Sequence, residues 1–372
     1  MICQIKLLAQ FYCSGTARLK AAFVMVPEMD IKDLGVRQVR EWFAQNAIAS
    51  FHADQCLRWI YQRQAEGFQD MSDLSKKTRD LLQDHFHNDR LALVRTAAAA
   101  DGTRKFLFGL KDGHTVETVL IPEKAHYTLC ISSQVGCAQG CRFCLTARGG
   151  LVRNLSCGEI VSQIRDVQHR LLPDDMPLTN IVLMGMGEPL ANYHHVAAAL
   201  GVITHAGAGM LYSNRRVTLS TAGMVPGIPA LGRDTDVNLA VSLNATDNRT
   251  RDRLMPINRR YPIESLLDAC ARFPLNHRRR ITIEYVLMQD VNDTPEDARR
   301  LGKLLTPLRV KINLIPFNPH PGSPFKTPSE TAVVRFQEIL IQKHFTVMIR
   351  KSKGRDISAA CGQLRAAQAV GG

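Results

Sequence analysis

Residues 130–144 read Cys-Ile-Ser-Ser-Gln-Val-Gly-Cys-Ala-Gln-Gly-Cys-Arg-Phe-Cys, and the rest of the chain can be interpreted outward from this stretch. Three of its cysteines, Cys137, Cys141 and Cys144, have the spacing Cys-x3-Cys-x2-Cys. Cysteine thiolates hold iron–sulfur clusters, and the two glycines of the loop allow it to fold tightly around one cube. The spacing therefore predicts a 4Fe-4S cluster with three protein ligands and one open iron.

A structural zinc site is the alternative for this loop. Zinc prefers four ligands, usually as two separated Cys-x2-Cys pairs or as cysteine with histidine. No second Cys-x2-Cys pair occurs in the chain. The spacing favours the cluster, and a zinc-containing RNA-binding protein stays as the alternative from a different class.

The composition is that of a folded protein with an anionic partner. The chain has 372 residues, of which 45% are hydrophobic, and this length allows a sizeable core and about two domains. No apolar run reaches the ~18 residues of a membrane span. The net charge of +13 indicates nucleic acid as the commonest partner. Four basic runs concentrate this charge: Arg215-Arg216, Arg259-Arg260, Arg278-Arg279-Arg280 and residues 351–355.

The cysteines indicate a reducing compartment. Four of the ten crowd between positions 130 and 144 of a large chain, unlike a disulfide framework, so we expect a cytoplasmic protein. Before Met25 the chain has three basic residues and no acid, but its apolar run is interrupted, which argues against export. Residues 1–29 are unlike the rest of the chain. We interpret them as an extension that is disordered or precedes the true start. No dimerisation motif is visible, and a monomer is expected.

Periodicity divides the remaining chain into parts. Residues 30–88 carry apolar side chains at three- and four-residue intervals, which predicts an N-terminal helical module, interpreted as RNA-binding. Residues 89–125 alternate apolar and polar residues around Asp-Gly turns, which predicts an antiparallel β-hairpin linker. Residues 126–365 alternate strand-like and helix-like segments, and 366–372 form a tail. Expected strands are 128–133, 180–186, 216–221, 238–244, 281–288, 311–317 and 345–350, and expected helices are 157–172, 193–205, 227–233, 263–273, 294–306 and 329–344.

Such alternation predicts an α/β fold in which helices cover a parallel sheet, here a partial (β/α)6 barrel. In (β/α) barrels the chemistry lies at the carboxyl ends of the strands. The polar motifs of this chain fall at those ends. They are the cysteine loop after the first strand, Gly-Met-Gly-Glu-Pro at 185–189 after the second, Ser220, Ser242 and Asn244 at the third and fourth, and Pro-Phe-Asn-Pro at 316–319 after the sixth.

These strand-end residues suit a small polar ligand. Glu188 lies on a glycine-flanked turn, where the backbone can approach a ligand closely and the carboxylate can bind an ammonium group. Ser220, Ser242 and Asn318 can offer hydrogen bonds to hydroxyl or carboxylate groups. Together they predict a cofactor that lies across the strand ends.

The cysteine loop resembles that of the radical S-adenosylmethionine superfamily, in which the cluster and the cofactor generate a 5′-deoxyadenosyl radical. The chain also contains Cys130, the Gly-Met-Gly-Glu-Pro turn and the ending Asp-Ile-Ser-Ala-Ala-Cys-Gly-Gln-Leu around Cys361. With these it closely resembles the RlmN family of dual-specificity 23S rRNA and tRNA adenine methyltransferases. The resemblance covers roughly residues 30–365 and implies a radical-SAM barrel.

The resemblance also implies a mechanism. Cys361 takes a methyl group from one S-adenosylmethionine, a second S-adenosylmethionine is cleaved, and the methylene radical on Cys361 adds to carbon 2 of adenine. Cys130 then resolves the protein–RNA adduct by forming a disulfide with Cys361. Glu117 matches the family's proton acceptor, although Cys130 can also act as the base. Cys137, Cys141 and Cys144 would bind the cluster, and Gly187, Glu188, Ser220, Ser242, Leu243, Asn244 and Asn318 would bind S-adenosylmethionine.

The partners implied by the resemblance are 23S rRNA at its peptidyl transferase centre, tRNAs methylated at the adenine 3′ of the anticodon, and an electron donor such as flavodoxin. A Cfr-like methyltransferase, which modifies carbon 8 of the same rRNA adenine, shares the cysteines and is the nearest rival. The long N-terminal module and the ending around Cys361 favour carbon 2.

Overall fold

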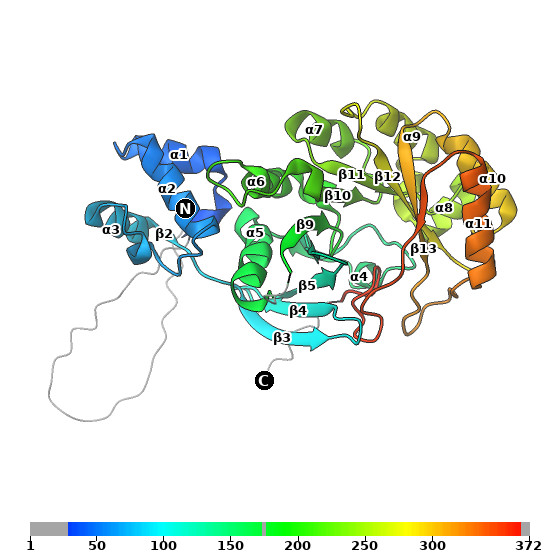
Figure 1. Ribbon diagram of the computed structural model, residues 1–372, viewed down its shortest axis with the longest axis horizontal. Coiled ribbons are helices and arrows are strands. Elements are labelled where there is room, and N and C mark those ends of the chain that lie inside the picture. The colour runs from blue at the N-terminus through cyan, green and yellow to red at the C-terminus, as the bar shows by residue number, and fades with distance from the viewer. Residues whose placement is uncertain (1–28, 173–175, 366–372) are drawn as a thin grey trace, which may run out of the picture.

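The computed structural model describes residues 29–172 and 176–365. A helical module at the N-terminus lies beside a long sheet, and further helices pack around the outside of that sheet (Figure 1). The extension expected over 1–29, apart from Met29, and the tail expected over 366–372 lie outside the described residues.

The N-terminal module contains three helices, each with one buried face. In the first, Val36, Val39 and Phe43 recur at three- and four-residue intervals and are buried together. The third begins after Ser75, whose hydroxyl accepts a hydrogen bond from the Thr78 amide and so caps the helix. The elements are β1 (Met29–Asp30), a 3-10 turn (Ile31–Asp33), α1 (Val36–Gln45), α2 (Ser50–Tyr61), a 3-10 turn (Phe68–Asp70), α3 (Lys76–His85) and β2 (Phe86–His87).

Buried charged side chains fasten this module to the barrel. The fully buried Arg165 guanidinium, from a barrel helix, donates a hydrogen bond to the Ala65 carbonyl oxygen of the module at 2.6 Å. The Arg90 guanidinium pairs at 2.9 Å with Asp166, the last residue of a barrel helix. Because a buried charge is tolerated only when it is paired, these contacts hold the module in one position on the barrel.

Residues 89–125 form three antiparallel strands, β3 (Ala92–Ala98), β4 (Arg104–Gly109) and β5 (Thr115–Pro122). β5 in turn pairs antiparallel with β6 (Tyr127–Cys130), the first strand of the barrel. The segment expected as a hairpin linker is therefore continuous with the barrel sheet. We call these three strands the sheet extension.

The barrel strands are all parallel, each hydrogen-bonded to the next, as the alternation of strands and helices predicts. This confirms the predicted α/β class. With the extension they make a sheet of ten strands in the order β14-β13-β12-β11-β10-β9-β6-β5-β4-β3. The strands after β6 are β9 (Leu178–Leu183), β10 (Val217–Thr221), β11 (Asn238–Ser242), β12 (Ile281–Leu287), β13 (Val310–Pro316) and β14 (Val347–Ile349).

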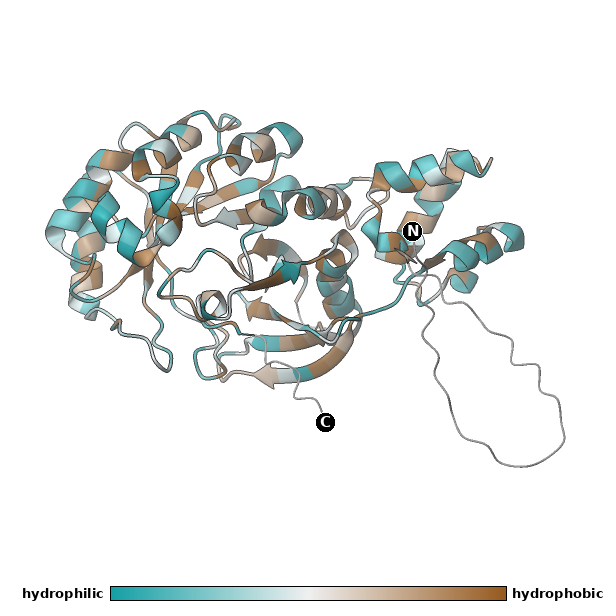
Figure 2. Ribbon diagram, turned by 180° about the vertical axis from the view of Figure 1, so that it is seen from behind, coloured by the Kyte–Doolittle hydropathy of each residue, from teal (hydrophilic) through white to brown (hydrophobic). Residues whose placement is uncertain are grey.

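Amphipathic helices cover the outside of the barrel. Apolar residues, brown in Figure 2, are frequent along the strands, whereas the outer helices carry many hydrophilic residues, drawn in teal. Capping boxes at Ser156 with Glu159 and at Thr294 with Asp297 start two of these helices where the sequence expects them. The helices are α5 (Cys157–Asp166), continued by a π turn (Val167–Leu171), α6 (Tyr193–Thr204), α7 (Gly227–Asp234), α9 (Ile263–Ala271), α10 (Pro295–Leu305) and α11 (Glu330–Gln342).

Several short elements have no counterpart among the expected ones, because segments of three to seven residues are too short to show a period. They lie in the loops at the strand ends. They are β7 (Gln134–Gly136), β8 (Leu151–Asn154), α4 (Leu145–Arg148), α8 (Asn248–Leu254) and 3-10 turns at Pro189–Asn192, Asn214–Arg216 and Pro256–Arg259. Across residues 29–172 and 176–365, no helix has the length and apolar character needed to cross a membrane.

Candidate active site

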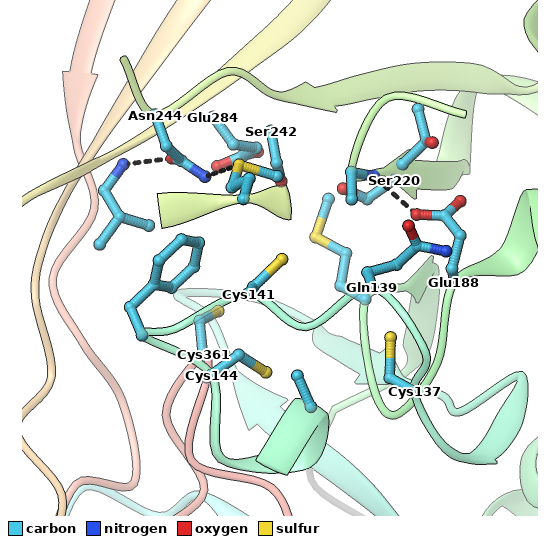
Figure 3. A pocket seen from close by; sticks show the side chains of 18 of the residues that line it. Cys137, Gln139, Cys141, Cys144, Glu188, Ser220, Ser242, Asn244, Glu284 and Cys361 are labelled. Atoms are coloured by element: carbon cyan, nitrogen blue, oxygen red, sulfur yellow. Dashed lines mark hydrogen bonds between the residues drawn. The ribbon is translucent and has the colours of Figure 1, made fainter. Parts of the chain in front are cut away.

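A cavity opens at the end of the barrel where the parallel strands finish. It contains about 990 Å³ free of protein atoms, counting its open mouth. Figure 3 shows cysteine sulfurs on one side of it and carboxylate and amide groups from the strand ends on the other. Ten residues expected from the sequence line it: Cys137, Cys141, Cys144, Gly187, Glu188, Ser220, Ser242, Asn244, Asn318 and Cys361.

The cysteine loop is shaped by the small hairpin of β7 and β8. Gly136 has φ of +77°, and a Cβ atom there would fall directly on the Gly150 carbonyl oxygen. That oxygen accepts a hydrogen bond from the Cys137 amide at 2.8 Å, and the Cys144 amide donates to the Cys141 carbonyl at 3.1 Å. The backbone therefore fixes the loop so that the three sulfur atoms lie around one shared space (Figure 3).

Glu188 presents a buried carboxylate to the cavity. Gly187, with φ of +105°, allows the turn to pass so close to Gln134 that a Cβ atom would lie 2.6 Å from the Gln134 side chain. The Glu188 carboxylate accepts hydrogen bonds from the Leu190 amide at 3.1 Å and the Ala222 amide at 2.7 Å. Burial raises the pKa of Glu188 to about 7, and the two amides oppose this rise.

A buried arginine ties the next two strand ends together. Arg251 is fully buried and donates to the carbonyl oxygens of Ala222, Ser242 and Leu243 at 2.8, 3.2 and 3.0 Å. These bonds hold the cavity-lining ends of β10 and β11 at a constant separation. The Leu243 side chain points into the hydrophobic core and does not line the cavity.

Asn244 lies in the cavity wall, but the protein itself already uses its amide. The residue has φ of +57°; its Oδ1 accepts from the Val286 amide at 2.7 Å, and its Nδ2 lies 3.2 Å from the Met255 sulfur. Asn318 differs in this respect. Its Nδ2 lies 3.4 Å from the Cys361 carbonyl oxygen, whereas its Oδ1 is buried and has no hydrogen-bond partner within the described structure.

Cys361 is exposed to the cavity, whereas Cys130 and Glu117 are not part of its wall. Cys130 is buried in a cluster with Ala359 and Leu364, which belong to the segment that carries Cys361. Burial raises the pKa of Cys130 to about 12, and the nearby Cys361 adds to this. Burial also raises the pKa of Glu117, against the effect of a neighbouring lysine. All eight cysteines in the part of the chain that the structure describes are free thiols.

Comparisons with known proteins assign the chain to a family. Residues 131–302 match the model of the radical SAM superfamily, and residues 29–87 match that of the ribosomal RNA large subunit methyltransferase N-terminal domain. The dual-specificity RNA methyltransferases RlmN of Desulfosudis oleivorans and Geobacter sulfurreducens are 54% and 52% identical to this chain. Each alignment covers 91% of this chain and 91% or 92% of the relative.

The chain belongs to the RlmN family. A solved structure agrees with this assignment. The radical SAM methyltransferase from Sphaerobacter thermophilus superposes with a TM-score of 0.84 at 42% identity, over 91% of this chain and 99% of that one. The radical SAM fold and the RlmN relationship expected from the sequence are thereby confirmed.

As a member of this superfamily, the chain uses a 4Fe-4S cluster and S-adenosylmethionine, and its cysteine loop has the donors for the cluster. Across the described ranges, no three His, Cys, Asp or Glu side chains converge to hold a single metal ion. A cluster does not need such convergence, because each thiolate caps a different iron. Burial raises the pKa of Cys137 to about 12, and a bound metal would oppose this rise by stabilising the thiolate.

The cavity wall also contains buried oxygens that are free to accept a hydrogen bond. Two buried oxygens of the wall, Asn318 Oδ1 and Glu284 Oε2, have no hydrogen-bond partner among the described residues. Buried polar atoms normally have one, so a ligand with amino and hydroxyl donors would fit here. With Glu188, these oxygens give the RlmN cavity three side chains that can accept hydrogen bonds from a ligand.

Two cavity residues, Glu284 and Arg350, were absent from the sequence-based expectations. Glu284 is a charged residue inside the buried strand Ile-Thr-Ile-Glu-Tyr-Val-Leu, and that break in pattern could have drawn attention to it. Arg350 directly follows β14, the same kind of position as the other strand-end residues. Its guanidinium lies among Cys361, Glu284 and Cys130, which raise its pKa.

We expect Gly136→Ala to destabilise the protein and to lower its iron content. The new Cβ would require both a left-handed backbone and displacement of the Gly150 carbonyl, which together cost about 2–5 kcal/mol. Gly113→Ala is the matched control, because Gly113 has φ of +84° with no atom within 4 Å of an added Cβ. It should cost only about 1–2 kcal/mol. Urea unfolding and iron analysis measure both effects, and equal losses for the two variants would contradict the clash.

S-adenosylmethionine binding should weaken below neutral pH. An ammonium group binds the ionised form of Glu188, whose pKa is about 7, so below that value a proton must first leave. Affinity should then fall by up to about tenfold per pH unit and level off above pH 7. Calorimetric titration of the anaerobic protein between pH 6 and 8 measures this. Glu188→Gln should bind more weakly and without this pH dependence, and a parallel slope in that variant would assign the proton elsewhere.

Proposed function

We propose that this enzyme methylates carbon 2 of an adenine in 23S rRNA and of the adenine 3′ of the anticodon in tRNAs. It would use two molecules of S-adenosylmethionine and carry the methyl group on Cys361. One observation supports this most strongly: the Cys361 thiol shares a cavity with the cysteine loop and Glu188, in a chain that aligns with RlmN enzymes over 91% of its length.

The target carbon explains why such a site is needed. Carbon 2 of adenine is an electron-poor amidine carbon and does not attack a methyl sulfonium as an amine would. A cluster bound at the cysteine loop, together with S-adenosylmethionine, would supply a radical that abstracts hydrogen from an unactivated methyl group. The protein must hold that methyl group at the cavity. Cys361 is the exposed thiol at this position.

Cys361 and Cys130 differ in their exposure, because Cys361 is exposed and Cys130 is buried. The exposed Cys361 can attack the methyl group of a bound sulfonium as a thiolate, near the Arg350 guanidinium. Cys130 lies buried under the same segment, next to Ala359, and close enough to Cys361 for the two thiols to interact electrostatically. We propose that Cys130 resolves the protein–RNA adduct with formation of a Cys130–Cys361 disulfide. A donor such as flavodoxin would reduce that disulfide and the cluster.

The positions of the basic runs suggest how RNA approaches. Arg259-Arg260 follow β11 and the 351–355 run follows β14, at the end of the barrel that holds the cavity. Arg215-Arg216 and residues 278–280 precede strands and therefore lie at the opposite end. We propose that the first two runs and the helical module contact RNA phosphates while the target adenine enters the cavity. Because its proposed substrates are rRNA and tRNA, we propose that the enzyme acts in the cytoplasm, and that it acts there as a monomer.

Isotope labelling tests the function directly. Anaerobically reconstituted protein would be given trideuteromethyl S-adenosylmethionine with rRNA or tRNA, and digested nucleosides would be examined by mass spectrometry. We expect 2-methyladenosine that carries two deuteriums, because one is lost when the methyl group on Cys361 is activated. Three deuteriums would mean intact methyl transfer and would refute the route, whereas 8-methyladenosine would assign the chain a Cfr-like activity.

A further inference from the structure

The segment that carries Cys361 has almost no regular secondary structure, and contacts with other parts of the chain hold it in place. Residues 354–365 form turns and irregular chain after β14. The turn between β3 and β4 contacts the start of this segment twice. The Asp101 carboxylate accepts a hydrogen bond from the Gly354 amide at 3.0 Å, and the Asp356 carboxylate accepts one from the Ala100 amide at 3.0 Å.

An ion pair on the sheet extension holds the segment on both sides of Cys361. The Lys105 ammonium donates to the Ser358 carbonyl oxygen at 3.1 Å and pairs with Glu117 Oε1 at 2.9 Å. Glu117 Oε2 accepts a hydrogen bond from the Arg365 amide at 2.7 Å. The ion pair is shielded from water, since the Lys105 and Glu117 side chains are 15% and 7% exposed. Each of its two members therefore binds the backbone of the segment.

The barrel side of the segment covers Cys130. Ala359 and Leu364 pack on Cys130, which is 8% exposed. The Thr146 hydroxyl donates to the Leu364 carbonyl at 2.6 Å, and the Leu145 amide donates to the Gly362 carbonyl at 2.7 Å. The segment is thus held between the barrel mouth and the sheet extension, with Cys361 on the cavity side and Cys130 beneath.

We infer that Lys105 and Glu117 are positioning residues that hold the Cys361 segment in place over Cys130. The effect of this pair on the reaction rests on the proposed function. Its effect on the position of the segment rests on the contacts alone. Neither residue lines the cavity, so each acts on the reaction through Cys361. Both oxygens of the Glu117 carboxylate are engaged, one by the Lys105 ammonium and the other by the Arg365 amide of the segment.

Thiol reactivity tests the placement without any catalysis. The reconstituted protein would be treated with N-ethylmaleimide, and the modification of Cys130 would be followed by peptide mass spectrometry. Lys105→Met should speed the alkylation of Cys130 by about tenfold, the shift expected when one charge-assisted hydrogen bond is lost. Lys105→Arg should largely restore protection. Lys111→Met is the control, because Lys111 also forms an ion pair on the extension, with Asp89 at 2.9 Å.

The inference would be overturned if Cys130 in Lys105→Met is alkylated at the wild-type rate while the iron content and melting temperature also equal those of wild type. Equal acceleration in Lys111→Met would also overturn it, because that would indicate general loosening of the extension. If Lys105→Met folds poorly, Glu117→Gln provides the same test from the other partner.

Single-turnover assays then separate positioning from proton transfer. If the pair holds the segment, Lys105→Met and Glu117→Gln should both slow methylation of Cys361 by about tenfold, and the double variant should be no worse than either single one. If Glu117 instead removes the proton from adenine, Glu117→Gln alone should accumulate a covalent protein–RNA adduct, and the inference fails. A wild-type protein that never methylates Cys361 would refute the proposed function, while the alkylation rates would still decide the placement.

Discussion

Replacement of Cys361 by alanine is expected to abolish RNA methylation, with a loss of at least about 10⁴-fold in single-turnover rate, as for other covalent nucleophiles. Cys361 is the exposed thiol of the cavity, and no other described cysteine outside the cluster loop lines that wall. Without it, no group remains to carry the methyl group to the base. Quantification of 2-methyladenosine after reaction with excess enzyme measures the loss.

The controls for Cys361→Ala concern the cluster and the fold. Iron and acid-labile sulfide should stay at wild-type levels, because the cluster would be held by Cys137, Cys141 and Cys144. Cys270→Ala is the matched control, since Cys270 is a buried core residue of α9. It should lower stability and leave the activity of the folded enzyme intact. Methylation retained by Cys361→Ala would exclude the methyl-carrier role.

Replacement of Cys130 by alanine is expected to trap RNA on the protein. Of the two thiols, the first half of the reaction needs only Cys361, so methylation of that thiol and attack on adenine should proceed. Release needs the second thiol, which lies under the Cys361 segment. Turnover should therefore stop at about one event per enzyme, with a stoichiometric adduct that survives denaturing electrophoresis.

A double variant shows whether the trapped species has the expected linkage. Cys130→Ala combined with Cys361→Ala should give no adduct, because the linking sulfur is absent. Normal turnover by Cys130→Ala would mean that Cys130 is only a core residue, in keeping with its burial in one cluster with Val119 and Leu364. An adduct that forms without Cys361 would point to a different nucleophile.

The sequence by itself determined the parts of this protein that depend on local patterns. Alternation of strand and helix periods predicted the parallel barrel, because each element needs only its own residues to show an apolar face. The Cys-x3-Cys-x2-Cys loop, the Gly187-Glu188 turn and the residues at the ends of β10 and β11 were placed at the cavity, because parallel strands all finish at one end.

Only the tertiary structure decided which of these groups are available and what holds them. The amide of Asn244 is occupied by Val286 and Met255, and Leu243 points into the core, although both lie in the expected motif. Glu284 and Arg350 reach the cavity from strands with no motif of their own. The spacing of a motif shows where a residue lies along the chain. It does not show which residues of neighbouring strands will form hydrogen bonds with it.

The sheet extension is the clearest example of this limit. Its alternating pattern predicted antiparallel strands, and nothing in that pattern indicated that they hold the C-terminal segment. Lys105 and Ser358 are 253 positions apart, and Glu117 and Arg365 are 248 apart. Contacts between residues so distant leave no local signal, because neither periodicity nor spacing records which surfaces meet when the chain folds. The sequence singled out Cys361 and Cys130 as candidate reactive thiols, and the folded chain determines where Cys361 is held.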